Sequence, residues 1–162
     1  MRNLMTTVAV AAALTIGSIS MALAAAPTTG NEIIDSVLAE YYQAVESACT
    51  PSDGVAANAS ACEAALRTFA ALSTPESLAT VPAIAAAISN GTLPRATFDT
   101  AVASNSFANS FLAANTALGN DIRAANADNP AFLIAISDTA SQTLGVNTAA
   151  GGDDEGSPTL AN

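Results

Sequence analysis

The spacing of apolar residues predicts an amphipathic helix near the start of the chain. Over residues 32–48 the apolar side chains recur every three or four positions, which is the spacing of one helix face. They are Ile33, Ile34, Val37, Leu38, Tyr41, Tyr42 and Val45. Glu32 and Asp35 fall in the first turn, where the helix dipole favours negative charge. The helix is therefore expected to begin after Asn31 as its N-cap.

The same periodicity, interrupted by turn residues, predicts further helices. A second helix runs to about Leu72 and starts either at Asp53 or at the capping box formed by residues 60–63. A third segment begins with Pro75, a residue favoured in the first helical position. Pro82 should break or kink this segment, because proline cannot continue the helical hydrogen bonding.

The second half of the chain contains two longer helical patterns. Residues 92–118 carry two apolar stripes whose phase slips near Asn105, so this segment forms either one bent helix or two. Gly119 is expected to end it, and a short helical turn is expected at 121–126. Residues 130–144 are apolar nearly all round over their first half, which is typical of a buried central helix.

Together these patterns predict an all-α domain over residues 32–145, a small bundle of four to six short helices joined by short loops. No alternating pattern typical of strands competes with them. A polar lead-in at 25–31 precedes the domain, and the small and charged residues 146–162 predict a disordered acidic tail. The predicted core consists of Ile34, Val37, Leu38, Tyr41, Leu66, Phe69, Ile84, Ile88, Phe98, Phe111, Leu133 and Ile136.

The first residues show a different pattern, that of a secretory signal peptide over residues 1–24. Arg2 is followed by a mostly apolar run over 4–16, which is too short to span a membrane. Ala22 and Ala24 then provide the small-x-small pattern of a cleavage site, and a cut after Ala25 fits nearly as well. The abundance of alanine and the absence of lysine suggest a bacterium. The mature protein is therefore expected in the periplasm or the medium.

Charge narrows the possible partners and chemistry. Without the signal peptide, Arg67, Arg95 and Arg123 face fourteen acidic residues, and the chain has no His, Lys or Trp. Such a surface repels phosphate groups, so we expect no nucleic-acid partner and no anionic membrane surface. No catalytic residues, metal site or cofactor are predicted, because histidine is absent and both thiols are expected to be paired. We expect that the protein is not an enzyme.

Cys49 and Cys62 are the only cysteines. An even number in an exported chain predicts one disulfide, which would join the end of the first helix to the start of the second. The alternatives are a redox-active pair, which the lack of C-x-x-C spacing disfavours, and free thiols. A bridge that closes a loop of this size stabilises a fold by about 3 kcal/mol in the chain-entropy model.

Two hypotheses for function follow. The favoured one is an exported protein that acts through a partner protein or through self-association. Tyr41 and Tyr42 diverge by about 100° on a helix, so one ring is expected in the core and the other, with Val45, at an interaction surface. In the alternative without an interaction surface, both rings lie in a wide buried stripe and their hydroxyls reach solvent. The second hypothesis for function is a carrier of a small apolar ligand, whose cavity would be lined by Phe98, Phe107, Phe111 and Phe132.

Two short motifs, residues 58–60 and 90–92, match the acceptor pattern for N-glycosylation. We expect both to be unused in a bacterium.

Overall fold

The computed structural model of the protein describes residues 26–145, and 73% of these residues are helical. The predicted signal peptide and acidic tail lie outside the described residues. Seven helices and no strand occur within 26–145, which confirms the all-α class. The helices are α1 (Glu32–Cys49), α2 (Ala59–Ala71), α3 (Pro75–Ala79), α4 (Pro82–Ser89), α5 (Arg95–Val102), α6 (Asn105–Ala125) and α7 (Pro130–Leu144).

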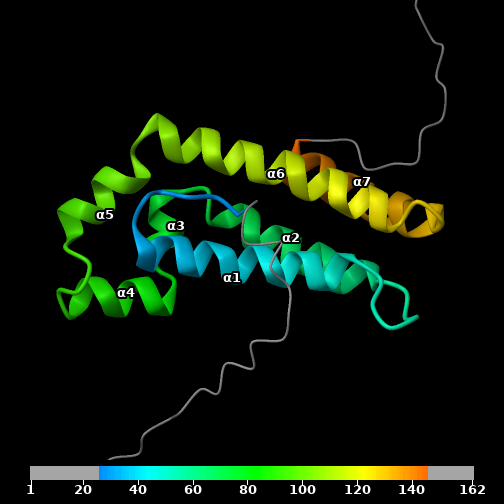
Figure 1. Cartoon of the computed structure of the whole chain (residues 1–162), viewed down its shortest axis with the longest axis horizontal. Coiled ribbons are helices and arrows are strands. Elements are labelled where there is room, and N and C mark those ends of the chain that lie inside the picture. The colour runs from blue at the N-terminus through cyan, green and yellow to red at the C-terminus, as the bar shows by residue number, and fades with distance from the viewer. Residues whose placement is uncertain (1–25, 146–162) are drawn as a thin grey trace, which may run out of the picture.

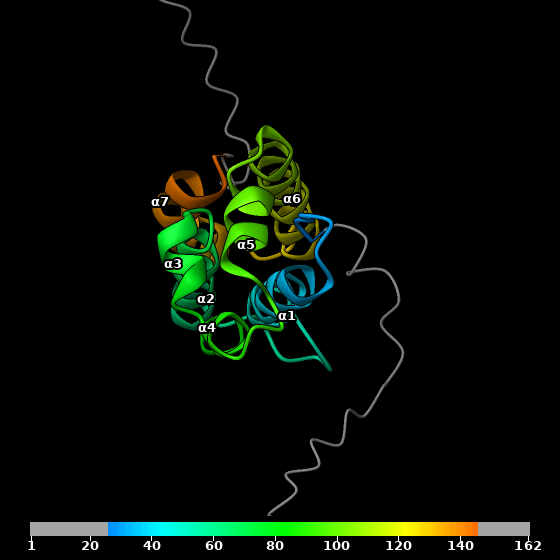
Figure 2. The same cartoon turned by 90° about the vertical axis from the view of Figure 1, so that its left-hand side faces the viewer.

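Four long helices form the body of the molecule in two layers. α1 and α2 lie antiparallel in one layer, and α6 and α7 lie antiparallel in the other (Figure 1). Helix α1 contacts α2 and α6, and α7 contacts α2 and α6, so the four helices enclose one core. The three short helices α3, α4 and α5 close one end of this arrangement, as the view along the bundle shows (Figure 2).

Prolines and polar caps explain why the helices are more numerous than expected. Pro82 separates α3 from α4 and occupies the first turn of α4, as predicted. The hydroxyl of Ser104 accepts a 3.2 Å hydrogen bond from the backbone N–H of Phe107 and caps α6. The segment 92–118 therefore contains two helices, and the phase slip near Asn105 marks the boundary between them.

The expected end of this segment at Gly119 was wrong. Helix α6 continues through this glycine to Ala125. Glycine inside a helix costs about 1 kcal/mol relative to alanine. Leu118 and Ile122, on either side of it, are fully buried, and their packing offsets that cost.

The other helix ends follow local capping rules. The side chain of Asn31 accepts hydrogen bonds from Ile33 N and Ile34 N, which confirms the predicted N-cap of α1. Helix α2 starts at neither predicted position, because Asn58 accepts a 3.0 Å hydrogen bond from Ala61 N and caps the helix there. Asp53 instead sits in a tight turn with Gly54, where both residues have positive φ.

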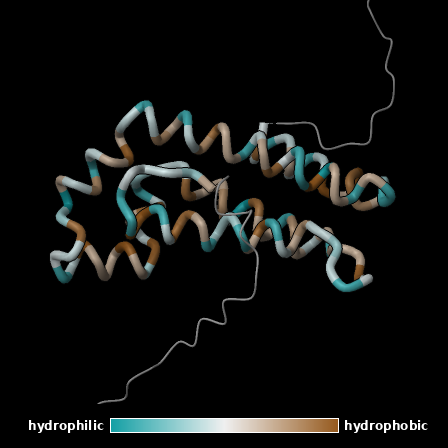
Figure 3. The backbone as a smooth tube through the Cα atoms, in the orientation of Figure 1, coloured by the Kyte–Doolittle hydropathy of each residue, from teal (hydrophilic) through white to brown (hydrophobic). Residues whose placement is uncertain are grey.

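The core agrees closely with the expected one. All predicted core residues are buried except Tyr41 and Ile88, which are partly buried and pack against the core. Hydrophobic and hydrophilic positions intermix along every helix, as amphipathic packing requires (Figure 3). The expectation that the helix over 130–144 is buried and central was wrong, because Ile134 on α7 is 65% exposed. The physical reason is that α7 packs mainly against α2 and α6, so its opposite side stays open to solvent.

The polar lead-in before α1 contacts the bundle. Ala26 and Pro27 are buried, and the N–H of Thr28 donates a 2.6 Å hydrogen bond to the hydroxyl of Ser110 on α6. The lead-in is therefore packed onto the bundle.

Within residues 26–145, no helix combines the length and the apolarity needed to cross a bilayer.

Candidate functional site

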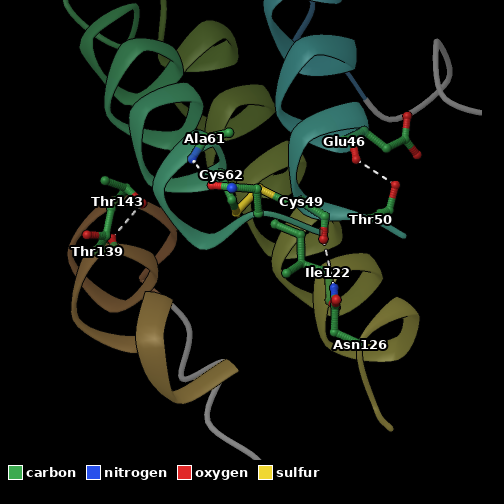
Figure 4. The surroundings of a disulfide bond; sticks show 10 residues. Glu46, Cys49, Thr50, Ala61, Cys62, Ile122, Asn126, Thr139 and Thr143 are labelled. Atoms are coloured by element: carbon green, nitrogen blue, oxygen red, sulfur yellow. Dashed lines mark hydrogen bonds between the residues drawn. A yellow bond between two sulfur atoms is a disulfide. The ribbon is translucent and has the colours of Figure 1, made fainter. Parts of the chain in front are cut away.

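The predicted disulfide is present at one corner of the bundle. Cys49 ends α1 and Cys62 lies in the first turn of α2, with a distance of 4.7 Å between their Cα atoms. Both side chains are fully buried. The side-chain amide of Asn126 donates hydrogen bonds to the carbonyl oxygens of Cys49, at 2.7 Å, and Ile122, at 2.9 Å (Figure 4). The corner thus joins the ends of α1 and α6 to the start of α2.

This environment indicates a structural disulfide. A redox-active cysteine needs access to its reaction partner and a group that stabilises the thiolate. The two sulfur atoms are enclosed at the junction of three helices. The bridge is therefore part of the core rather than a catalytic centre.

Aromatic rings fill the space between α1, α2 and α6. The rings of Tyr42 and Phe69 meet edge to face at 5.8 Å between centroids, and Phe69 stacks on Phe111 at 4.9 Å. Phe107 then contacts Phe111 edge to face at 5.8 Å. Such contacts add to the stability gained from burial of the rings.

The four phenylalanines expected to line a ligand cavity are packed in the core. Phe98, Phe107, Phe111 and Phe132 are all core residues with at most 5% of their surface exposed. Phe107 and Phe111 face other aromatic rings instead of an open space. An open depression does exist, but different residues line it, namely Thr29, Gly30, Asn31, Ala96, Thr97, Thr100 and Ala101.

The depression lies where the lead-in passes α5, and Asp35 binds two of the lead-in residues that line it. One carboxylate oxygen of Asp35 accepts hydrogen bonds from the N–H of Thr29, at 2.6 Å, and from its hydroxyl, at 2.8 Å. The other oxygen accepts from Gly30 N at 3.2 Å. The lining residues are uncharged and contain no acid, base or thiol. Asp35 therefore fixes the shape of this loop.

One tyrosine of the pair lies in the core and the other at the edge, as expected, but the predicted core contained Tyr41 and the structure buries Tyr42 instead; Val45, expected at the interaction surface, was wrongly placed. Tyr42 is 1% exposed and Val45 is fully buried, whereas Tyr41 is partly exposed. The cause is that α2 and α6 both pack on α1 and cover the side that carries Tyr42 and Val45. The alternative, in which both tyrosine hydroxyls reach solvent, is wrong for Tyr42, because its hydroxyl is buried.

The hydroxyl of Tyr42 is a buried polar group in an acidic setting. Its oxygen has no hydrogen-bond partner among the described residues. Burial, with the charges of Asp121 and Glu46, raises the pKa of Tyr42 to about 12. Burial, with the charge of Asp121, also raises the pKa of Glu46. At neutral pH the phenol is therefore protonated and does not act as a base.

The acidic groups of the described domain do not assemble into a metal centre. Across residues 26–145, no three His, Cys, Asp or Glu side chains lie close enough together to hold a metal ion. Only the described part of the chain is covered by this finding.

The outer face of α6 is an uncharged and partly apolar surface that the sequence analysis did not single out. Residues 105–120 contain no Asp, Glu, Lys or Arg. Several of them are exposed nevertheless: Ala108, Asn109, Leu112, Ala113 and Thr116. We call these five residues the α6 face; its largest apolar side chain, Leu112, is 61% exposed. The uncharged run was visible in the sequence, but its position on the surface was not.

Comparisons with known proteins found no match for the chain. It matches no protein-family model, no curated protein and no solved structure.

Proposed function

We propose that this is an exported, non-enzymatic protein of the bacterial envelope that acts by packing the α6 face against another protein. Self-association is the case in which that protein is a second copy of the chain. The observation that carries the proposal is the absence of charge over residues 105–120 on an exposed helix, in a chain with a formal net charge of −10.

Two physical arguments favour a protein partner for this face. Outward faces of surface helices normally carry charged residues, whereas the centres of protein interfaces are depleted in them. An uncharged face also avoids the desolvation penalty that buried charges incur on association. The protruding Leu112 side chain on the α6 face can insert between the side chains of a partner.

Export is supported by the disulfide and by the sequence pattern. Disulfides persist in oxidising compartments such as the periplasm, so the Cys49–Cys62 bridge is compatible with an exported protein. The signal-peptide pattern over residues 1–24 supports the same assignment. The finer assignment to the periplasm or the medium rests on this pattern alone.

A binding role is favoured over the carrier by the packed interior. The aromatic contacts between Tyr42, Phe69 and Phe111 occupy the space that a ligand would need between α1, α2 and α6. Native mass spectrometry of the protein from its source provides the check. A stoichiometric apolar molecule that stays bound would favour the carrier.

The binding role is tested with two matched substitutions. Leu112→Asp places a charge on the α6 face, and Val55→Asp places one on the α1–α2 turn, where Val55 is 69% exposed. Both positions are exposed, so neither change should alter the melting temperature. A photoreactive residue at each position in living cells, followed by mass determination of the adducts, reports association.

We expect adducts from position 112 and none from position 55, and we expect Leu112→Asp to abolish association that Val55→Asp leaves intact. The adduct mass distinguishes a second copy from a different protein. Unchanged association of the Leu112→Asp variant would contradict the proposal.

A further inference from the structure

The turn between α4 and α5 contains Asn90-Gly91, the only Asn-Gly pair in the sequence. We propose that Asn90 is a site of spontaneous modification in the folded protein, at which the side-chain amide is converted to a carboxylate. The reaction needs only water and is independent of the proposed binding role.

The chemistry runs through a cyclic imide. The backbone nitrogen of Gly91 loses its proton to solvent and attacks Cγ of Asn90, so that a new C–N bond forms. The bond from Cγ to Nδ2 breaks and ammonia leaves. Water then opens either carbonyl of the five-membered ring. The products are aspartate with the normal backbone and isoaspartate, in which the chain continues through the side chain.

The geometry of the turn leaves this reaction open. Asn90 and Gly91 are both exposed, and no atom beyond Gly91 and its two chain neighbours lies within 4 Å of the position that a Cβ of Gly91 would take. The N–H of Gly91 donates a single 3.2 Å hydrogen bond, to the carbonyl oxygen of Ile88. Rotation of the peptide after Asn90 breaks only this bond and brings the nitrogen towards Cγ.

A second contact favours the attack. The N–H of Thr92 donates a 2.9 Å hydrogen bond to Oδ1 of Asn90. This is the oxygen on which negative charge develops when the nitrogen adds to Cγ, and a donor already aimed at such an oxygen stabilises the charge. The turn therefore polarises the amide that must react.

Five other described asparagines lie in settings that oppose the reaction. Asn109, Asn115 and Asn120 lie inside α6, where the following N–H belongs to the helical hydrogen-bond ladder. Asn58 is followed by Ala59, whose Cβ hinders the approach of its backbone nitrogen to Cγ, whereas Gly91 has no Cβ. Asn129 is followed by a proline, which has no N–H to lose.

The modification has a structural consequence. It adds a negative charge at the C-terminal end of α4, where the helix dipole favours positive charge. Isoaspartate also lengthens the main chain just before Leu93, which is 1% exposed and whose N–H donates a 2.9 Å hydrogen bond to Ala87 O. We therefore expect the product to be more acidic and less stable in the α4–α5 region.

The test is incubation of the purified full chain at mildly alkaline pH, with peptide mapping by mass spectrometry over time. We expect the peptide with Asn90 to gain the mass that separates an acid from an amide, and to contain isoaspartate. The rate should rise with pH, because Gly91 must lose a proton. The peptide with Asn58 in the same digest serves as an internal control and should stay unchanged.

Two comparisons make the outcome decisive. The Asn90→Gln variant should show no conversion at this position, because glutamine would need a larger ring. A sample unfolded in denaturant gives the rate of Asn90 conversion in the unfolded chain. If Asn90 converts only in the unfolded sample, or no faster than Asn58 in the native one, the proposal is wrong.

Discussion

The side-chain amide of Asn126 donates a 2.7 Å hydrogen bond to the carbonyl oxygen of Cys49, and so joins the end of α6 to the end of α1. Asn126 is 1% exposed, although it lies at the C-cap of α6. The disulfide adds α2 to the same corner. The stability of this corner can therefore be tested at Asn126 and at the cysteines separately.

Replacement of Asn126 by alanine should destabilise the fold by about 1–3 kcal/mol, because the carbonyl oxygen of Cys49 loses its buried donor. Urea unfolding measures the change. Asn120→Ala, an exposed position on the same helix, is the control and should have little effect. Equal stabilities of the two variants would contradict the role given to Asn126.

Replacement of both Cys49 and Cys62 by alanine should lower the free energy of unfolding by roughly 3 kcal/mol, because the unfolded chain is no longer cross-linked. Thermal unfolding with and without reductant measures it. Reductant should destabilise the native protein and leave the double variant unchanged. If the native protein, unfolded and refolded in reductant, were as stable as without it, the bridge would not be stabilising.

Glu46→Gln should stabilise the protein at neutral pH and not in acid. The folded state raises the pKa of Glu46 above its ordinary value of 4.5, through burial and the charge of Asp121. The stability associated with this group is thus fully present below 4.5 and is lost as pH rises through the folded pKa. Melting temperatures across this range provide the measurement. Glu40→Gln, exposed on the same helix, is the control, and the same pH-dependent gain there would refute the assignment.

Tyr42→Phe should keep or increase stability, because it removes a buried hydroxyl that has no partner among the described residues. The pKa of Tyr42 is raised from 10.0 to about 12, so in the native protein stability should fall as pH rises between these values. The variant should lack this part of the alkaline loss. Alkaline unfolding curves that coincide for the two proteins would contradict the burial of the hydroxyl.

The starts of several helices were predictable from the sequence, and this has a local cause. Asn31 caps α1 through the N–H groups of Ile33 and Ile34, and Pro82 begins α4. Such interactions act within about one helical turn, so neighbouring residues in the sequence are enough to reveal them. The pairing of the two cysteines was predictable for a simpler reason, since each has only one possible partner in the chain.

Tertiary packing decided the features that depend on several helices at once. Tyr41 and Tyr42 are equivalent in the sequence pattern, and only the positions of α2 and α6 bury Tyr42 and leave Tyr41 at the edge. Helix α6 continues through Gly119 because buried neighbours offset the local preference. The missing charges of residues 105–120 are a property of the sequence, but they form an exposed α6 face only because α1, α5 and α7 pack against the opposite sides of the helix. Propensity and capping act on neighbouring residues, whereas burial depends on contacts between segments far apart in the chain.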